Sequence, residues 1–393
     1  MGALTDVRVL DFGRYIAGPF CAALLGDLGA DVIRVERVDG GEDRFVGPVT
    51  DDGVGSMFLQ CNRNKRCLTL NPVKEEGREV VRRLVATADV VVANLPPATL
   101  VQMGLDYDTL RAIKADIILT TVNAFGSGGP WSNKVGFDGL AQSASGNLHL
   151  SGPADQPVRS FVPYVDFGTA SLSALATVAA LRHRDQTGEG QFIEGALLRT
   201  ALTFNSGALI EQDLLGIDRV GTMNRGQTSG PADVHRTKDG WVMVLVIGAY
   251  QFERWCELVG RPELLSDDRF KDDLARGDNG EALSAIMDEW CGQRTTDEVL
   301  ALLEQHKVPG GPVYSPQQAL DDEHINAIDF LKDTEYPTAA KPVRLADFPV
   351  RLSASPGEIR HRAPQLGEHT EEILASLGYS NDDIASLRDA RIV

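Results

Sequence analysis

Residues 7–36 read VRVLDFGRYIAGPFCAALLGDLGADVIRVE and decide the fold of the first part of the chain. The apolar run at 7–12 predicts a buried strand, residues 20–28 have helical periodicity, and the β-branched run at 31–36 predicts a second strand. Gly29 lies where this helix should end, because glycine adopts the left-handed backbone of a helix C-terminus without strain. A strand, a helix and a strand in succession indicate two parallel strands with the helix packed on their sheet.

The same alternation continues beyond this first unit. We expect a helix over 75–88, a strand over 89–93, a short helix over 110–114 and another buried strand over 117–122. Strands that alternate with helices are typical of a mostly parallel sheet covered by helices. The predicted fold class is therefore α/β, with a Rossmann-like topology in this part of the chain.

The second half of the chain has a different pattern. A helix of small residues is expected over 169–181 and a strand over 191–194, followed by a polar, Gly-rich linker at 216–231. A strand over 240–247 and acidic helices over 251–307 then indicate a smaller, separate domain of α+β type. Residues 339–364 should be extended, and two closing helices are expected over 368–377 and 381–388.

Charge and composition exclude several classes of partner and compartment. The 393 residues include 38 Lys and Arg against 56 Asp and Glu, a formal net charge of −18, which disfavours binding to nucleic acids or membrane surfaces. The five cysteines form no CxxC pair, so we expect neither disulfides nor a zinc ribbon, and a reducing cytoplasm fits best. We find no export-signal pattern and no apolar run near the ~20 residues needed to cross a bilayer.

Local motifs exclude several kinds of chemistry. The seven histidines never occur in HxH, HxxxH or HExxH spacing, so no local metal site is expected. Neither a GxSxG elbow nor a GxxxxGK[ST] loop is present. The first turn after a strand, residues 12–19, also lacks GxGxxG, which weakens the hypothesis of a dinucleotide-dependent dehydrogenase.

Asp166 is the carboxylate that stands out on physical grounds. It follows the apolar run 161–165 and precedes the predicted small-residue helix by about one turn. At such a place a carboxylate can be partly desolvated and still be stabilised by the free N–H groups of the helix terminus. The alternative is that Asp166 only caps that helix. Both interpretations stay open at this point.

Two loops and a set of cations could bind phosphate or an oxyanion. The Gly-rich segments at 125–131 and 247–249 have free backbone N–H groups, although both could be ordinary loops. Basic residues also gather near the first strands of this acidic chain and suit a small polyphosphate ligand, unless each is only a solvated surface charge. They are Arg34, Arg37, Arg44, Lys65 and Arg66.

In their order along the chain, ten segments resemble the family III CoA-transferases (the CaiB/BaiF family), which include formyl-CoA transferase, and the related α-methylacyl-CoA racemases. The resemblance covers essentially the whole chain, and its motifs are specific when taken together. They are residues 4–12, 17–19, 25–36, 64–70, 88–94, 126–130, 136–138, 165–166, 187–191 and 363–369.

The resemblance implies a two-domain subunit and an enzymatic function. The large domain would comprise residues 1–215 and 330–393, and the small domain residues 225–325. Two ring-like subunits would interlock as a homodimer. The implied substrates are an acyl-CoA and a small carboxylic acid, with coenzyme A as co-substrate and no further cofactor or metal. A dicarboxylate acid is our expectation from the breadth of the family.

The resemblance also implies the mechanism and its residues. Asp166 would attack the acyl-CoA thioester, giving an aspartyl anhydride and later an aspartyl-CoA intermediate. Such intermediates keep the activation that hydrolysis would waste, so the protein must chiefly exclude water and stabilise oxyanions. Asp138 stands where formyl-CoA transferase has an assisting glutamate. Gly248 falls near the glycine loop that covers the intermediates in the family.

Coenzyme A contacts follow from the same resemblance, one position at a time. The positions that match the family's CoA-binding segments are Ile16, Ala17, Arg37, Leu70, Asn71, Asn94, Lys134 and Phe137. Two positions depart from the pattern, because Gln102 and Val135 stand where some members carry Arg and Lys. If these contacts are right, Arg37 and Lys134 should lie near the Asp166 pocket while the acidic excess lies elsewhere.

Phe137 separates the two branches of the superfamily. The racemases resemble Gly-His-Asp here, with the His as one of two bases that exchange the α-proton, whereas Phe137 has no titratable group. CoA transfer is therefore favoured, and a 2-methylacyl-CoA racemase is the alternative. A non-catalytic CoA-binding protein would be expected to have lost the carboxylate at position 166, which this sequence keeps.

Overall fold

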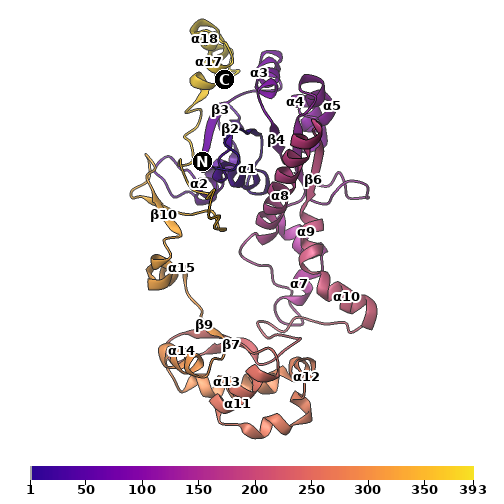
Figure 1. Cartoon of the computed structure of the whole chain (residues 1–393), viewed down its shortest axis with the longest axis vertical. Coiled ribbons are helices and arrows are strands. Elements are labelled where there is room, and N and C mark those ends of the chain that lie inside the picture. The colour runs from indigo at the N-terminus through magenta and orange to yellow at the C-terminus, as the bar shows by residue number, and fades with distance from the viewer. Residues whose placement is uncertain (1) are drawn as a thin grey trace. The chain divides into compact units, whose positions relative to one another are not determined.

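The structure is a computed structural model that describes residues 2–393, which pack into two compact units (Figure 1). Unit 1 comprises residues 2–145, 160–206 and 326–393, and unit 2 comprises residues 146–159 and 207–325. These units describe how the residues pack. The boundaries of functional domains expected from the sequence stay a prediction.

A six-stranded parallel sheet forms the centre of unit 1, with strand order β3-β2-β1-β4-β5-β6. The prediction of a mostly parallel, helix-covered sheet is confirmed, and β3 is a strand that the sequence analysis did not anticipate. The strands are β1 (Arg8–Asp11), β2 (Asp31–Glu36), β3 (Lys65–Thr69), β4 (Val90–Ala93), β5 (Ile118–Asn123) and β6 (Phe192–Ala196). β1 pairs in parallel with both β2 and β4, so the chain reverses its direction of winding across the sheet at β1.

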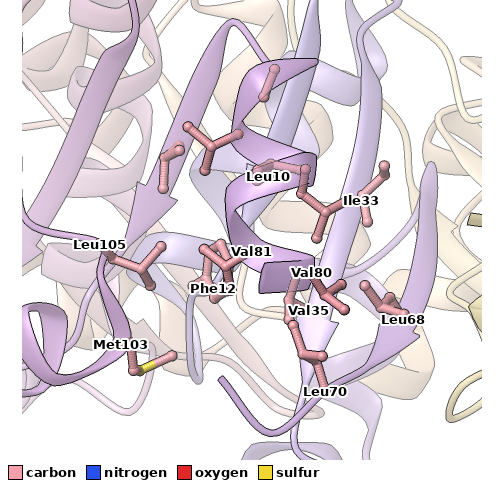
Figure 2. Packing of buried hydrophobic residues seen from close by; sticks show 14 of the residues in the cluster. Leu10, Phe12, Ile33, Val35, Leu68, Leu70, Val80, Val81, Met103 and Leu105 are labelled. Atoms are coloured by element: carbon pink, nitrogen blue, oxygen red, sulfur yellow. The ribbon is translucent and has the colours of Figure 1, made fainter. Parts of the chain in front are cut away.

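Alternate residues of these strands face two different helical layers. Leu10 and Val35 point into a cluster with α3 (Glu75–Ala86), while Val9 and Val32 point into a cluster with α1 (Ala17–Asp27). The first cluster, shown in part in Figure 2, also receives apolar residues of α4 (Pro97–Met103), α5 (Tyr107–Ile113), α17 (Thr370–Ser376) and α18 (Asn381–Asp389). Each fully buried aliphatic side chain contributes about 1.5–3 kcal/mol. Successive side chains of a strand point to opposite faces, which places apolar residues on both sides of a covered sheet.

Helix α8 (Tyr164–Thr187) lies on the α1 side of the sheet (Figure 1). Among the described helices it alone is long and apolar enough to cross a membrane. The sequence analysis found no apolar run of this length. Its small residues, including Ala170 and Ala174, are buried against α1 and the strands. It begins five residues before the predicted helix at 169–181, so Asp166 lies inside its first turn.

The end of the chain returns to the β3 edge of the sheet. The His369 N–H donates to the Cys67 carbonyl at 3.0 Å, and His369 Nδ1 accepts the Cys67 N–H at 3.2 Å. Residues 339–364, expected to be extended, include one strand of an antiparallel pair, β10 (Leu331–Thr334) with β11 (Val343–Ala346). The two closing helices are α17 (Thr370–Ser376) and α18 (Asn381–Asp389), close to the predicted ranges.

Unit 2 combines a three-stranded antiparallel sheet with helices. The sheet has the order β7-β8-β9 and consists of β7 (Ala232–Arg236), β8 (Trp241–Leu245) and β9 (Gly310–Pro312). Trp255 and Met287 are fully buried in its core, where the Trp255 indole N–H lies 3.2 Å from the Met287 sulfur. The prediction of smaller structure of α+β type is confirmed, and its sheet is antiparallel.

The remaining helices complete the two units. They are α2 (Ser56–Cys61), α4 (Pro97–Met103), α5 (Tyr107–Ile113), α6 (Asp138–Ala144), α7 (Asn147–Leu150), α9 (Leu197–Phe204), α10 (Ser206–Leu215), α11 (Ala249–Val259), α12 (Asp273–Asp278), α13 (Gly280–Gly292), α14 (Thr296–Gln305), α15 (Pro316–Asp321) and α16 (Glu323–Ala327).

Candidate active site

Asp166 is the third residue of α8, whose N-cap is Pro163. The prediction that Asp166 precedes the helix by one turn is wrong. The helix begins earlier than its apolar pattern suggests, because a carboxylate distant in the sequence binds the N–H groups of its first turn. The Val165 N–H donates to Asp138 Oδ2 at 2.8 Å, and the Asp166 N–H donates to the same atom at 3.1 Å. Asp138 therefore performs the capping role, and the alternative that Asp166 only caps this helix is wrong. A carboxylate in this role stabilises a helix by about 0.5–2 kcal/mol.

Asp138 is buried, with 4 % of its surface exposed, and both of its carboxylate oxygens are engaged. Oδ2 accepts the two backbone N–H groups, and Oδ1 accepts a hydrogen bond from Gln142 Nε2 one turn later on α6. Asp138 is the first residue of α6, directly after the loop that leaves β5. With these contacts, Asp138 positions the first turn of α8 and, within it, Asp166.

The Asp166 carboxylate, in contrast, accepts no hydrogen bond from the described residues 2–393. Burial disfavours its charged form, and the negative charge of Asp138 adds to this effect, so that its pKa rises from the ordinary 3.8 to about 7. A carboxylate with this pKa is present in both protonation states near neutral pH. A strongly raised pKa in a cavity is typical of reactive groups.

Asp166 lines a cavity of about 480 Å³ at the carboxyl ends of the strands. In open α/β sheets this edge, near the point where the strand order reverses, is where ligands bind. The loops after β1, β4 and β5 all contribute to it. Of the predicted binding residues, the cavity brings together Ile16, Ala17, Asn94, Lys134 and Phe137.

A second cavity, of about 510 Å³, adjoins the first. It contains the other predicted binding residues, Arg37, Leu70 and Asn71, and it shares the lining residues Arg14 and Leu95 with the Asp166 cavity. We call the first the Asp166 cavity and the second, after the part of the ligand that we propose for it below, the nucleotide cavity. Lys134 and Arg37 thus line neighbouring hollows of one unit, as expected from the sequence. Gln102 lines neither cavity, whereas Val135 lines the Asp166 cavity.

Asn94 fixes the loop that the two cavities share. Its Oδ1 accepts the Arg14 N–H at 2.6 Å, and its Nδ2 donates to the Arg14 carbonyl at 2.8 Å. Arg14 Nη1 is buried and has no hydrogen-bond partner among the described residues. Sequence reasoning missed Arg14, although it lies in the quoted first turn, because an arginine in a loop carries no local signal of burial.

Phe137 and Lys134 lie on the loop between β5 and α6. Phe137 is 57 % exposed and packs edge-on against Tyr15, with ring centroids 5.7 Å apart. The Lys134 Nζ lies 4.7 Å from the centroid of the Trp131 ring. This wall of the Asp166 cavity is therefore aromatic, with one cation at its side.

Gly248 belongs to unit 2, at the start of α11. Its backbone has φ +84, a conformation that side chains disfavour, and its N–H donates to both carboxylate oxygens of Asp273 at 3.0 Å. The turn therefore requires glycine, and the role of Gly248 over Asp166 stays a prediction.

The Gly-rich loop at 125–131 is an ordinary loop. The Gly126 N–H donates to Asn123 Oδ1 at 2.6 Å, and Ser127 Oγ donates to the Glu194 carboxylate at 2.9 Å. These contacts bind the loop to β5 and β6, and the Glu194 carboxylate beside it disfavours an anionic ligand. The hypothesis that this loop binds phosphate is therefore not supported.

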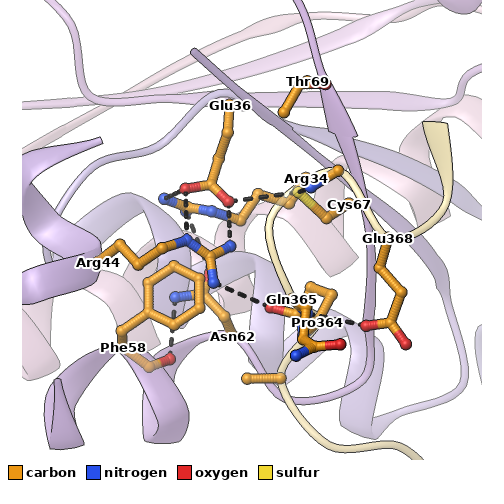
Figure 3. Close-up of polar contacts among 12 residues, drawn as sticks. Arg34, Glu36, Arg44, Phe58, Asn62, Cys67, Thr69, Pro364, Gln365 and Glu368 are labelled. Carbon is orange, nitrogen blue, oxygen red and sulfur yellow. Dashed lines mark hydrogen bonds and ion pairs between the residues drawn. The ribbon is translucent and has the colours of Figure 1, made fainter. Parts of the chain in front are cut away.

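Most of the basic residues near the first strands line neither the Asp166 cavity nor the nucleotide cavity. Arg34, Arg44 and Lys65 are almost fully buried, and they pair with the carboxylates of Asp11, Glu36 and Asp43. We call these six residues the ion cluster; Figure 3 shows the part around Arg34, Glu36 and Arg44, which stacks on Phe58. The hypothesis that these cations bind a polyphosphate is wrong for Arg34, Arg44 and Lys65.

Charges in the ion cluster compensate one another. Burial alone would raise the pKa of Glu36, but the guanidiniums of Arg34 and Arg44 outweigh that effect and lower it to about 2. Likewise, burial acts to raise the pKa of Asp11, and Lys65 and Arg34 reverse the shift, so that its pKa is lowered. Arg66, outside the cluster, pairs with Asp31 and Glu372. Of the five cations singled out, only Arg37 lines one of the two cavities.

Comparisons with known proteins agree with this arrangement. The profile of CoA-transferase family III matches residues 4–370. The chain is 32% identical to a succinyl-CoA–D-citramalate CoA-transferase of Chloroflexus aurantiacus, over 99% of this chain and 98% of that protein. It is 33% identical to a succinyl-CoA:mesaconate CoA-transferase of Haloarcula hispanica, over 96% of this chain and 97% of the relative.

A crystal structure of a CaiB/BaiF family protein from Brucella suis has the same fold. The TM-score is 0.84 at 33% identity, over 96% of this chain and 99% of that one. Family profile, curated relatives and solved structure agree over nearly the full length of the chain. The chain therefore belongs to CoA-transferase family III and is an enzyme of that family.

Proposed function

We propose that this enzyme moves CoA from an acyl-CoA to a free dicarboxylic acid through covalent intermediates on Asp166. The observation that carries the proposal is the partly buried Asp166 carboxylate, which lines a cavity at the carboxyl ends of the strands and whose pKa is raised to about 7. A carboxylate without donated hydrogen bonds is a better nucleophile than a solvated one, because it need not shed its solvent before it attacks.

Each step transfers one acyl bond and requires no redox partner. The ionised Asp166 attacks the thioester carbonyl, an Asp166–acyl anhydride forms, and the C–S bond breaks to release CoA as thiolate. The thiolate then attacks the aspartyl carbonyl, which gives aspartyl-CoA and the donor acid. The acceptor carboxylate attacks aspartyl-CoA in the same way, and the returning thiolate takes the acceptor acyl group and regenerates Asp166.

Residues around the cavity support different parts of this proposal. Asp138 would act as a positioning residue, since its carboxylate holds the first turn of α8. Ile16, Ala17, Asn94, Lys134 and Phe137 would surround the pantetheine, and Arg37, Leu70 and Asn71 the nucleotide. Gly248 would cover the intermediate. Coenzyme A is a co-substrate in this scheme.

Dicarboxylates are the substrate class that the relatives favour. The names of the two curated relatives described above contain succinyl-CoA as donor and citramalate or mesaconate as acceptor. All of these acids carry two carboxylates, of which only one takes part in acyl transfer. Lys134, a cation on the wall of the Asp166 cavity, would donate hydrogen bonds to the second carboxylate.

Trapping of the intermediate tests the proposal. The enzyme is incubated with succinyl-CoA and a panel of dicarboxylates, and hydroxylamine captures the activated carboxyl group as a hydroxamate. We expect CoA exchange and a hydroxamate at residue 166, both lost in Asp166→Ala. Exposed Asp185, on the same helix, provides the control Asp185→Ala, which should behave as wild type. Undiminished exchange in Asp166→Ala would contradict the mechanism.

Racemisation of a 2-methylacyl-CoA is the alternative activity. Phe137 lines the Asp166 cavity at the position of the racemase histidine and supplies no base. A racemase would incorporate deuterium at the α-carbon when it is incubated with a 2-methylacyl-CoA in deuterated water. We expect no incorporation at a rate comparable to CoA transfer, and rapid incorporation would favour the alternative.

We also propose an interlocked homodimer in the cytoplasm. Helix α10 has no buried residue, and its exposed apolar side chains include Ile210, Leu214 and Leu215. Such a surface is typical of an interface. All five cysteines are unpaired and buried, as a reducing compartment allows. Light scattering should give twice the chain mass of 42.5 kDa, and a monomer at micromolar concentration would overturn the dimer.

A further inference from the structure

Arg391 is an arginine at the nucleotide cavity that the sequence analysis did not consider. Its backbone is firmly placed: the Asn71 N–H donates to the Ile392 carbonyl at 2.7 Å, and Lys74 Nζ donates to the Ala390 carbonyl at 2.8 Å. Ile392 is buried in the large hydrophobic cluster. Arg391 itself has φ +52, so its side chain projects from a backbone conformation that is uncommon for a residue other than glycine.

The cavity concentrates positive charge in a chain of net charge −18. Its lining includes Arg37, Lys74 and Arg391, with Arg14 at the junction to the Asp166 cavity. Two acidic residues also line it: Glu36, whose charge is compensated in the ion cluster, and Asp39. Positive charge therefore predominates around this cavity, as a polyanionic ligand requires.

The side chain of Arg391 is available to such a ligand. It is 68 % exposed, and its only recorded partner among the described residues is Asp39, at 2.7 Å from Nη2 to Oδ1. An exposed pair of this kind contributes only about 0–1 kcal/mol. A phosphate dianion accepts two parallel N–H bonds from a guanidinium and competes well with a single carboxylate.

The shape of CoA assigns its phosphate groups to different parts of the two cavities. If the thioester is at Asp166, the nucleotide occupies the adjoining cavity, whose apolar residues Phe12, Val35 and Leu70 suit an adenine ring. The diphosphate joins pantetheine to nucleotide and so passes the junction at Arg14. The 3′-phosphate is the remaining dianion, on the ribose, and it falls to the exposed rim where Arg391 lies.

We propose that Arg391 binds the 3′-phosphate of CoA, so that the enzyme distinguishes CoA from 3′-dephospho-CoA. The proposal rests on the proposed function, because it takes CoA as the ligand of these cavities. It adds a residue from the last segment of the chain to a site that is otherwise built from the loops after β1, β2, β3 and β4.

Calorimetric titration with CoA and with 3′-dephospho-CoA tests the inference. Arg391→Gln should weaken CoA binding about 10-fold and leave 3′-dephospho-CoA binding unchanged. Arg388→Gln is the matched control, because Arg388 is an exposed arginine three residues earlier that pairs with Glu371 and lines neither cavity. This control should bind both ligands as wild type does. Equal losses for both ligands in Arg391→Gln, or no loss for CoA, would overturn the assignment.

Two further measurements keep this test separate from that of the proposed function. Arg391→Lys keeps a charge without the fork of N–H groups, so it should lose less CoA affinity than Arg391→Gln; an equal or larger loss would contradict the proposal. Hydroxamate trapping in the wild-type enzyme at saturating succinyl-CoA tests the proposed function without any change at Arg391. If wild type discriminates the two ligands but gives no hydroxamate, the proposed function fails and Arg391 keeps its role.

Discussion

The ion cluster and the Asp166 cavity treat buried carboxylates in opposite ways. In the ion cluster, Glu36 and Asp43 are buried beside Arg34 and Arg44, and the pKa of Glu36 falls to about 2. In the Asp166 cavity, one partly buried carboxylate lies near another, and its pKa rises to about 7. Both regions lie in unit 1, around the ends of the same sheet.

The difference separates structural charge from reactive charge. A carboxylate that is held by two guanidiniums is stabilised in its ionised form and is a poor nucleophile. Asp166 is destabilised in that form by burial and by Asp138, which itself takes the backbone N–H groups of α8. The N–H groups at the start of α8 thus donate to the positioning carboxylate of Asp138, and the carboxylate of Asp166 receives none of these hydrogen bonds.

The largest effect is expected from breaking the ion cluster. Arg34→Met should lower the free energy of unfolding by about 3–5 kcal/mol, because it leaves Asp43 buried without its cation. Urea denaturation measures this loss. The matched control is Arg37→Met, whose side chain is 61 % exposed and pairs only loosely with Glu42, so its change should stay below about 1 kcal/mol. Equal losses in the two variants would show that the cluster is not a structural element.

The position of the reactive carboxylate gives the second largest effect. Asp166→Glu keeps the charge but moves the carboxylate by one methylene, which should reduce the rate of CoA exchange about 10²-fold. The rate is measured with succinyl-CoA and labelled succinate. Asp185→Glu, further along the same helix and exposed, should keep the wild-type rate. A wild-type rate in Asp166→Glu would argue against a nucleophilic role.

A smaller effect concerns the pH dependence that Asp138 imposes. Only the ionised Asp166 can attack, so the single-turnover rate of adduct formation should rise with pH through about 7. Asp138→Asn keeps an oxygen for the two backbone N–H groups but removes the negative charge that helps to raise the pKa of Asp166. The midpoint should therefore move to lower pH. Asp106→Asn, at the N-cap of α5, is the control and should not move it; an unchanged midpoint in Asp138→Asn would exclude the electrostatic coupling.

The smallest effect is a gain in stability. Between pH 4 and 7 an unfolded Asp166, with a pKa of 3.8, loses its proton while the folded protein keeps it, so rising pH destabilises the fold until about pH 7. Asp166→Asn lacks this penalty and should be more stable than wild type at pH 8 by at least about 1 kcal/mol. At pH 4 the two proteins should differ little. Thermal unfolding at both pH values measures the difference, and a variant that is less stable at pH 8 than wild type would contradict it.

Local patterns in the sequence were sufficient for the sheet and for much of the site. Strands at 7–12, 31–36, 89–93 and 117–122 were predicted from apolar and β-branched runs, and all four are present. Because parallel strands end at one edge, residues that directly follow them, such as Ile16 and Asn94, meet at one cavity. The proximity of Asp166 to the start of an apolar helix was also predicted from local sequence, although that helix begins two residues before Asp166.

Tertiary structure alone decided how the charged residues are used. Arg34 and Arg37 are three residues apart, yet one is buried among carboxylates and the other lines a cavity, because alternate residues of β2 face different layers and Arg37 lies beyond the strand end. Asp138 reaches α8 across 27 residues, and Arg391 reaches the nucleotide cavity from the far end of the sequence. Strand and helix periods depend on neighbours along the chain and can be read from it, whereas desolvation and charge pairing depend on neighbours in space.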